Sequence, residues 1–125
     1  MPMADFTRSD RVAVQLRKEL SVLVHAAVRD HALPSVSVSD VEVSRELDVA
    51  NVYVTTLVSA QGPAAVAALK EMAVEFRRTL SRSLRMRRVP ELRFRYDDSV
   101  DRGERIEALL RDNRPAAPDA PADED

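Results

Sequence analysis

The chain has 125 residues, of which 45% are hydrophobic and 32% are charged, and it contains no Cys and no Trp. This length suits one domain, and the hydrophobic content is sufficient to build a core. The absence of Cys excludes disulfides, Cys-ligated metals and thiol catalysis. No uncharged stretch approaches the roughly 20 apolar residues of a membrane span. The first ten residues lack the apolar segment of a signal peptide, so we expect a cytoplasmic protein.

The net charge of −2 conceals a strong segregation of charge along the chain. Residues 115–125 contain four acidic residues and no base, whereas residues 77–95 contain eight Arg and one acid, Glu91. Eight minus one gives residues 77–95 a local charge of +7, which is the strongest compositional feature of the chain. We call these eight residues the arginine strip; they are Arg77, Arg78, Arg82, Arg85, Arg87, Arg88, Arg93 and Arg95.

The first predicted element is a helix over residues 8–29. Thr7 and Asp10 have the spacing of a capping box, which satisfies unpaired N–H groups at a helix start. Pro34 disfavours a helical conformation at the residue before it, so the helix should end before Leu33. An apolar stripe at steps of three and four residues predicts the buried face; it comprises Val12, Leu16, Leu20, Leu23, Val24 and Ala27.

Two strands are predicted next, over residues 35–44 and 48–59. The first strand alternates apolar and polar residues in one phase before Ser39 and in the opposite phase after Asp40. One extra residue at this point predicts a β-bulge. The connection over residues 45–47 is short, which favours an antiparallel hairpin.

A long helical pattern follows over residues 63–86. Its apolar stripe would drift by about 100° around a straight helix. We therefore expect a kink or break between Met72 and Phe76. Residues 92–96 alternate Leu, Phe and Tyr with Arg and predict a third strand with one apolar face and one Arg face. The helical crossover is long enough for the second and third strands to pair in parallel.

A last short helix, capped by Asp98 or Ser99, is expected to complete one domain over residues 5–113. Residues 114–125 are acidic and rich in Pro and Ala, so we expect them to form a disordered tail. The predicted fold class is α+β, with helices on one face of a three-stranded mixed sheet. The order helix, strand, strand, kinked helix, strand is the order of type II KH-like domains, which alone is a weak signal.

Few residues of this chain suit catalysis. His25 and His31 are the two His, and neither has a carboxylate at metal-ligand spacing on one helix. The two Gly are far apart, so the chain has no glycine-rich phosphate loop. Asp97, Asp98 and Asp101 could form a magnesium site, but helix capping explains them more simply. We therefore expect no enzymatic activity, no metal and no cofactor.

The arginine strip fits a nucleic-acid interface better than any catalytic site. The planar Arg fork binds phosphate oxygens, and structured RNA is recognised largely through phosphates and 2′-hydroxyls. On an ideal helix Arg78, Arg82 and Arg85 lie within about 60° of each other. The candidate RNA-contacting residues are Arg78, Arg82, Arg85, Arg87, Arg88 and Arg93, extended along the first helix by Arg8, Arg11, Arg17 and Lys18.

Three other interpretations of these charged residues remain possible from the sequence alone. Glu71 and Glu75 could pair with Arg78 and Arg82 and leave an ordinary solvated helix face, although they cannot reach residues 85–95. A protein-interaction adaptor could use the strip to bind an acidic partner. A small nuclease using Asp97 and Asp101 is a weaker alternative.

Residues 85–99, R-M-R-R-V-P-E-L-R-F-R-Y-D-D-S, resemble the C-terminal motif of bacterial ribosome-binding factor A. Gly103, Arg105 and Ile106 extend this match, and segments 11–13, 41–47 and 50–54 agree with the family in order and spacing. The resemblance covers roughly residues 5–110. It implies a non-catalytic protein with a type II KH-like fold, and we expect that protein to be a monomer.

By the same resemblance, the partner would be the small (30S) ribosomal subunit and its 16S rRNA. The expected role is help in late maturation of 16S rRNA, with a link to cold adaptation, and other assembly factors are further candidate partners. KH domains usually carry a G-x-x-G loop between their paired helices, and this family typically has an Ala-x-Gly kink there. The corresponding positions, Met72-Ala73-Val74, contain no Gly, so the single-strand grip of KH domains is not assumed.

Overall fold

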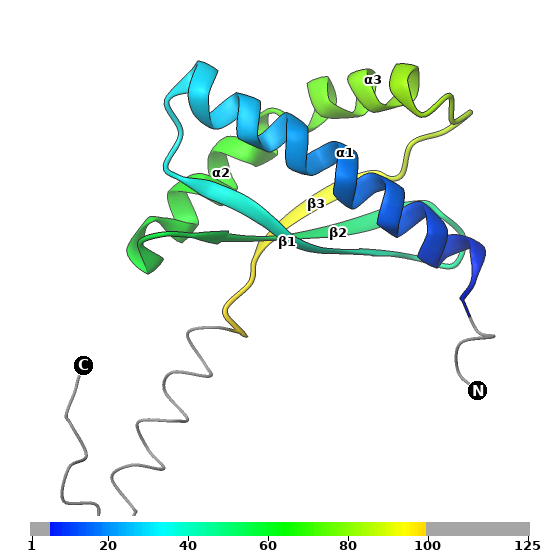
Figure 1. Ribbon diagram of the computed structural model, residues 1–125, viewed down its shortest axis with the longest axis horizontal. Helices are drawn as coiled ribbons and strands as arrows, with labels where there is room; N and C mark the ends of the chain where they lie inside the picture. The colour runs from blue at the N-terminus through cyan, green and yellow to red at the C-terminus, as the bar shows by residue number, and fades with distance from the viewer. Residues whose placement is uncertain (1–5, 100–125) are drawn as a thin grey trace, which may run out of the picture.

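The computed structural model describes residues 6–99 and arranges them as helices on a small sheet (Figure 1). The strands have the order β1-β2-β3; β1 and β2 are antiparallel, and β2 and β3 are parallel. Among residues 6–99 the helices cover one face of the sheet and leave the other open, so the predicted α+β fold is confirmed. The elements are α1 (Arg8–His31), β1 (Val36–Val43), β2 (Val49–Thr56), the 3-10 helix η2 (Ser59–Gln61), α2 (Gly62–Glu71), α3 (Ala73–Ser83) and β3 (Glu91–Tyr96).

Helix α1 begins and packs as its sequence predicts. The Thr7 hydroxyl accepts a hydrogen bond from the Asp10 N–H, and the Asp10 carboxylate accepts one from the Thr7 N–H, so the capping box is confirmed. The helix runs two residues beyond the predicted end and closes with Ala32 in a left-handed conformation at φ 55°. Its buried residues all belong to the predicted stripe; they are Leu16, Leu20, Val24 and Ala27.

The hairpin and its bulge are also confirmed. The register of β1 on β2 shifts between Val38 and Asp40, where the alternation changes phase. The Ser39 hydroxyl lies at this bulge and bonds the Asp97 carboxylate at 2.6 Å. The bulge thereby connects one edge of the sheet to the end of the other edge strand. Strand β2 ends at Thr56, earlier than predicted, and the two apolar residues after it, Leu57 and Val58, are exposed.

The crossover helix is broken at Met72, at the N-terminal limit of the predicted interval. The break needs no Gly, because Met72 has φ −95° and ψ 1°, which a non-glycine residue adopts. It corrects the drift of the apolar stripe, so Leu69 before it and Phe76 after it are both buried. The Phe76 and Phe94 rings meet edge to face with centroids 5.9 Å apart.

Strand β3 has the two faces that its alternation predicts. Leu92 and Phe94 are buried, whereas Arg93 and Arg95 are exposed on the open face of the sheet. The parallel pairing with β2 is confirmed as well, and Val52 lies opposite Phe94 in the register. The predicted last helix, apart from its capping residues, and the predicted tail over residues 114–125 lie outside the described residues.

Candidate nucleic-acid interface

Three segments that are distant in sequence meet at one end of the molecule (Figure 1). They are the start of α1, the turn between β1 and β2, and the segment that follows α3. Together they line a groove with four arginines and one acid, a lining charge of four minus one, or +3. We call it the arginine groove; its lining residues are Arg8, Val12, Gln15, Glu46, Leu47, Ser83, Leu84, Arg85, Met86, Arg87 and Arg88.

The four arginines of this groove are exposed and have no side-chain partner within residues 6–99. The ion pairs that do form in this part of the chain join Arg29 to Asp30 and Arg93 to Glu91. Neither Glu71 nor Glu75 takes part in one. The guanidinium groups of the groove are therefore available to acceptors from outside the protein.

The helical-wheel prediction for Arg85 is wrong. Helix α3 ends at Ser83, and Arg85 has a left-handed backbone conformation with φ 53°. Arg85 therefore leaves the helix face that carries Arg78 and Arg82. The chain reverses there and carries Arg85 towards Arg87 and Arg88, on the segment that lines the groove.

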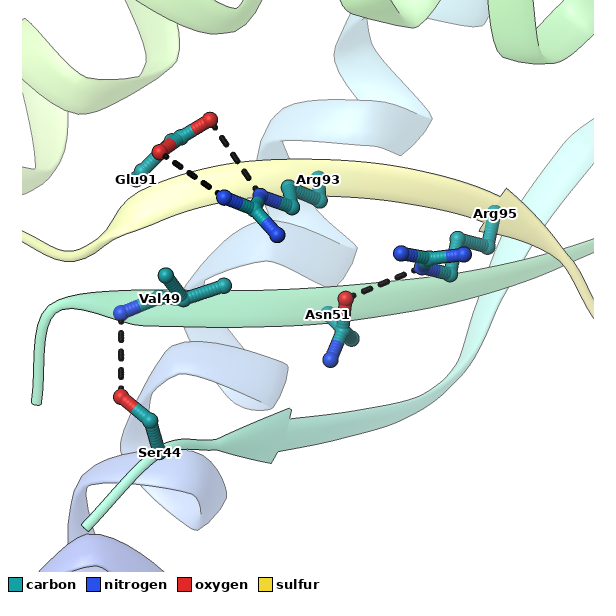
Figure 2. Close-up of polar contacts among 6 residues, drawn as sticks. All are labelled: Ser44, Val49, Asn51, Glu91, Arg93 and Arg95. Atoms are coloured by element: carbon teal, nitrogen blue, oxygen red, sulfur yellow. Dashed lines mark hydrogen bonds and ion pairs between the residues drawn. The ribbon is translucent and has the colours of Figure 1, made fainter.

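The hairpin turn that forms one wall of the groove is held by Ser44. Its hydroxyl donates to the Asp48 carboxylate at 2.7 Å and accepts from the N–H groups of Asp48 and Val49 at 3.1 Å each; Figure 2 shows the contact with Val49. The Ser44 hydrogen bond is the largest cause of a lowered pKa at Asp48, followed by the backbone N–H of Asp48 itself. The positive charges of Arg88 and Arg93 lower this pKa further.

Two arginines of β3 are engaged on the open sheet face. Arg93 Nε lies 3.3 Å from the Glu91 carboxylate, and Arg95 Nε donates to the side-chain oxygen of Asn51 at 3.0 Å (Figure 2). Arg93 would have to give up or share this partner to bind a phosphate. It is therefore a weaker candidate than the free arginines of the groove.

The remaining candidates lie outside the groove. Arg78 and Arg82 are exposed on α3, and Arg11 and Lys18 are exposed on α1. Arg17 follows Arg8 by nine residues, which places it about half a turn, 180°, around the helix. The structure thus brings Arg8, Arg85, Arg87 and Arg88 together in one groove, whereas the other six candidates do not line it; these are Arg11, Arg17, Lys18, Arg78, Arg82 and Arg93.

Sequence reasoning missed the groove residues that are not basic, above all Glu46, Leu47 and Gln15. Gln15 lies on α1, and Glu46 and Leu47 lie on the hairpin turn; only the tertiary arrangement of these segments around the groove brings them beside the arginines. Leu47, like Arg85, has a left-handed backbone conformation, with φ 63°. Two of the three non-glycine residues with positive φ in residues 6–99 therefore line this one groove.

No cluster of three potential metal ligands occurs within the described part of the chain. The Asp97 carboxylate bonds Ser39 and accepts from the Ser99 N–H at 2.9 Å, which is the capping role considered for it. Asp101, the other residue of the candidate magnesium site, lies outside the described residues. None of the helices between residues 6 and 99 has the length and apolar character needed to cross a bilayer.

Comparisons with known proteins indicate the same family over nearly the whole chain. The sequence model of the family described as Ribosome-binding factor A matches residues 8–110. A Ribosome-binding factor A of Xanthomonas euvesicatoria pv. vesicatoria is 56% identical over 126 residues, which cover 100% of this chain and 97% of that protein.

Two structures of Thermus thermophilus proteins are similar to this fold. The crystal structure of ribosome-binding factor A has a TM-score of 0.63 and 28% identity, and the match covers 72% of this chain and 97% of that one. A homology model of the Thermus thermophilus factor, fitted into a cryo-EM map of a complex with the 30S subunit, has a TM-score of 0.58 and 30% identity. That match covers 69% of this chain and 91% of the other.

Proposed function

We propose that this chain, which belongs to the ribosome-binding factor A family, binds the 30S ribosomal subunit through its arginine groove and assists late maturation of 16S rRNA. The observation that carries the proposal is the convergence of Arg8, Arg85, Arg87 and Arg88 on one groove. The similar Thermus thermophilus protein in a 30S complex supports the choice of partner.

The chemistry of the groove suits the phosphate backbone of folded RNA. Guanidinium groups with free N–H donors form bidentate, charge-assisted hydrogen bonds with phosphate oxygens. The groove is also adjacent to the N-terminus of α1, whose dipole favours an anion. In this proposal the four groove arginines contact phosphates directly. Arg11, Lys18, Arg78, Arg82 and Arg93 contribute long-range attraction around them, and Arg17 contributes least.

The rest of the proposal concerns the activity, oligomeric state, location and domain limits of the protein. We infer a non-catalytic, monomeric and cytoplasmic assembly factor with a link to cold adaptation, as family membership suggests. Its domain spans residues 5–113 and is followed by an acidic tail over residues 114–125. The family match over residues 8–110 falls inside the proposed domain, which supports its limits.

Salt dependence of binding tests the groove directly. Each phosphate contact contributes about −0.7 to −0.9 to the slope of log affinity against log salt. The double variant Arg87→Gln/Arg88→Gln should therefore flatten the slope for 30S subunits by roughly 1.4–1.8. The matched control Arg29→Gln/Lys70→Gln removes the same charge at two exposed residues outside the groove and should leave the slope nearly unchanged. Equal changes in both variants would contradict groove binding.

Nuclease digestion separates this function from that of an adaptor for an acidic protein. The tagged chain is captured with its bound particle and treated with ribonuclease. An RNA-bound particle should be released, whereas an acidic protein partner would be retained. Retention of the partner after complete RNA digestion would favour the adaptor.

A further inference from the structure

The lining of the arginine groove differs from that of a simple phosphate-binding surface. Val12, Leu47, Leu84 and Met86 belong to it and are half-buried, so the lining combines apolar side chains with the guanidinium groups. A phosphate gains nothing from the apolar side chains, because it is fully polar. A nucleobase does gain from them, since its flat face is apolar and stacks on side chains.

Glu46 is the second feature that phosphate binding does not explain. It is the one acid among the groove-lining residues, it is exposed, and it forms no ion pair within residues 6–99 although four arginines share the groove. A carboxylate in this place weakens phosphate binding through charge repulsion. It suits instead a ligand that presents hydrogen-bond donors, because an ionised carboxylate only accepts.

The backbone around Glu46 is fixed before any ligand arrives. The Leu47 N–H donates to the Ser44 carbonyl at 2.9 Å, and the Ser44 hydroxyl accepts from the N–H groups of Asp48 and Val49. Leu47 completes the turn with a positive φ, as Arg85 does on the opposite wall. Non-glycine residues held in this conformation are concentrated at binding and switch sites.

We propose that the arginine groove holds one unpaired guanine nucleotide of the bound RNA. The base lies against the apolar side chains of Leu47 and Met86, and Glu46 accepts from both N–H groups of its Watson–Crick edge. Arg87 and Arg88 bind the flanking phosphates. Among the four bases, guanine alone has two adjacent donors on this edge, which match the two carboxylate oxygens. The proposal rests on the proposed RNA-binding function and adds the identity of the base.

Short RNA probes can separate the contribution of the base to the binding affinity from the contribution of the phosphate charges. The probes are single-stranded adenine oligonucleotides whose central residue is guanine, inosine or adenine. Inosine lacks the exocyclic amine, so it offers one donor where guanine offers two. The wild-type protein should prefer the guanine probe to the adenine probe by roughly 5- to 150-fold, the discrimination of a good bidentate pair. The inosine probe should fall between them.

The variant Glu46→Gln should abolish this preference while binding all three probes at least as tightly as the adenine probe binds wild type. The gain comes from the removed negative charge. Glu71→Gln is the matched control; it makes the same charge change on exposed α2 and should keep the guanine preference. Thermal melts of both variants verify folding.

The outcomes distinguish this inference from the proposed function. Equal wild-type affinities for the guanine and adenine probes would overturn the guanine site, and so would a preference that survives Glu46→Gln. Absence of binding to every probe at salt concentrations where 30S subunits bind would overturn it too. If Arg87→Gln/Arg88→Gln still flattens the salt slope in these cases, the RNA-binding function stands without the base pocket.

Discussion

Arg77 Nη2 donates a hydrogen bond to the Val89 carbonyl oxygen at 2.8 Å. This bond joins α3 to the far end of the segment that carries the groove arginines. Arg77 is half-buried, Val89 is 4% exposed, and the Arg77 Nε atom is buried without a hydrogen-bond partner in the part of the chain that the structure describes. One member of the arginine strip is therefore a structural residue that closes the loop between α3 and β3.

The variant Arg77→Ala should destabilise the fold. It leaves the buried Val89 carbonyl without its donor, and an unsatisfied buried polar group costs about 1–3 kcal/mol. The matched control is Arg78→Ala, the exposed neighbour, which should change stability by less than about 0.5 kcal/mol. Chemical denaturation of the two variants measures the difference. Equal stabilities would show that the Arg77–Val89 bond does not hold this loop.

Two substitutions of Arg85 can separate the backbone strain at this residue from its contribution to 30S binding. The left-handed conformation costs a non-glycine residue about 1–2 kcal/mol, partly offset by the greater entropy that Gly loses on folding. Arg85→Gly should therefore be more stable than Arg85→Ala by about 0.5–1 kcal/mol. Both variants lose the same charge, so both should weaken 30S binding alike. If Arg85→Gly is no more stable than Arg85→Ala, the positive φ carries no strain.

The fold could be predicted from the sequence because its signals are local. The capping box of Thr7 and Asp10, the phase change at Ser39 and the alternation of β3 each act over a few residues. The break at Met72 could also be predicted, since the stripe drifts too far for one straight helix. Boundaries were less accurate: β2 ends at Thr56 because Leu57 and Val58 pass beyond the covered part of the sheet and are exposed.

The candidate site could be predicted only in part, because a charge count contains no tertiary information. The charge count places Arg77 in the same strip as Arg85, Arg87 and Arg88, although Arg77 is not among the predicted RNA-contacting residues, and it could not show that Arg77 bonds the Val89 carbonyl. The apolar pattern also predicted a helix through Arg85, since no Gly or Pro marks the end of α3. The place of Glu46 in the groove depends on the arrangement of the hairpin turn relative to a segment about 40 residues later in the chain, which no local sequence pattern shows.

Gly62 opens α2 in contact with the Tyr96 ring of β3. A Cβ atom at this position would lie 2.8 Å from Tyr96 Cδ1 and 3.0 Å from Cε1. Gly62→Ala should therefore destabilise the fold by about 1–3 kcal/mol through overpacking, although Ala is ordinarily the better helix former. In a Tyr96→Leu background the same change should be neutral or stabilising. A double-mutant cycle measures this coupling, and an unchanged cost in that background would place the strain elsewhere.

The pKa of Asp48 gives a local measure of the hairpin turn. Its pKa is lowered chiefly by the Ser44 hydrogen bond, so the folded chain binds this proton less readily than the unfolded chain. The resulting stabilisation is present above the unfolded value near 3.8 and is lost as the pH falls through the lower, folded value. Ser44→Ala removes the hydroxyl that donates to the carboxylate, and it should raise the Asp48 pKa towards 3.8.

Carbon-13 NMR of the carboxyl groups follows this titration in the folded protein between pH 2 and about 6, around the ordinary Asp range. Ser44→Ala also removes the acceptor for the Asp48 and Val49 N–H groups, and that loss of stability does not depend on pH. Asp48→Asn is the control, because it removes the titrating group and keeps an acceptor oxygen for Ser44. The stability difference between wild type and Asp48→Asn should therefore shrink as the pH falls through the Asp48 pKa. A difference that stays constant with pH, or an Asp48 pKa unmoved by Ser44→Ala, would show that the turn is not held by this charge-assisted bond.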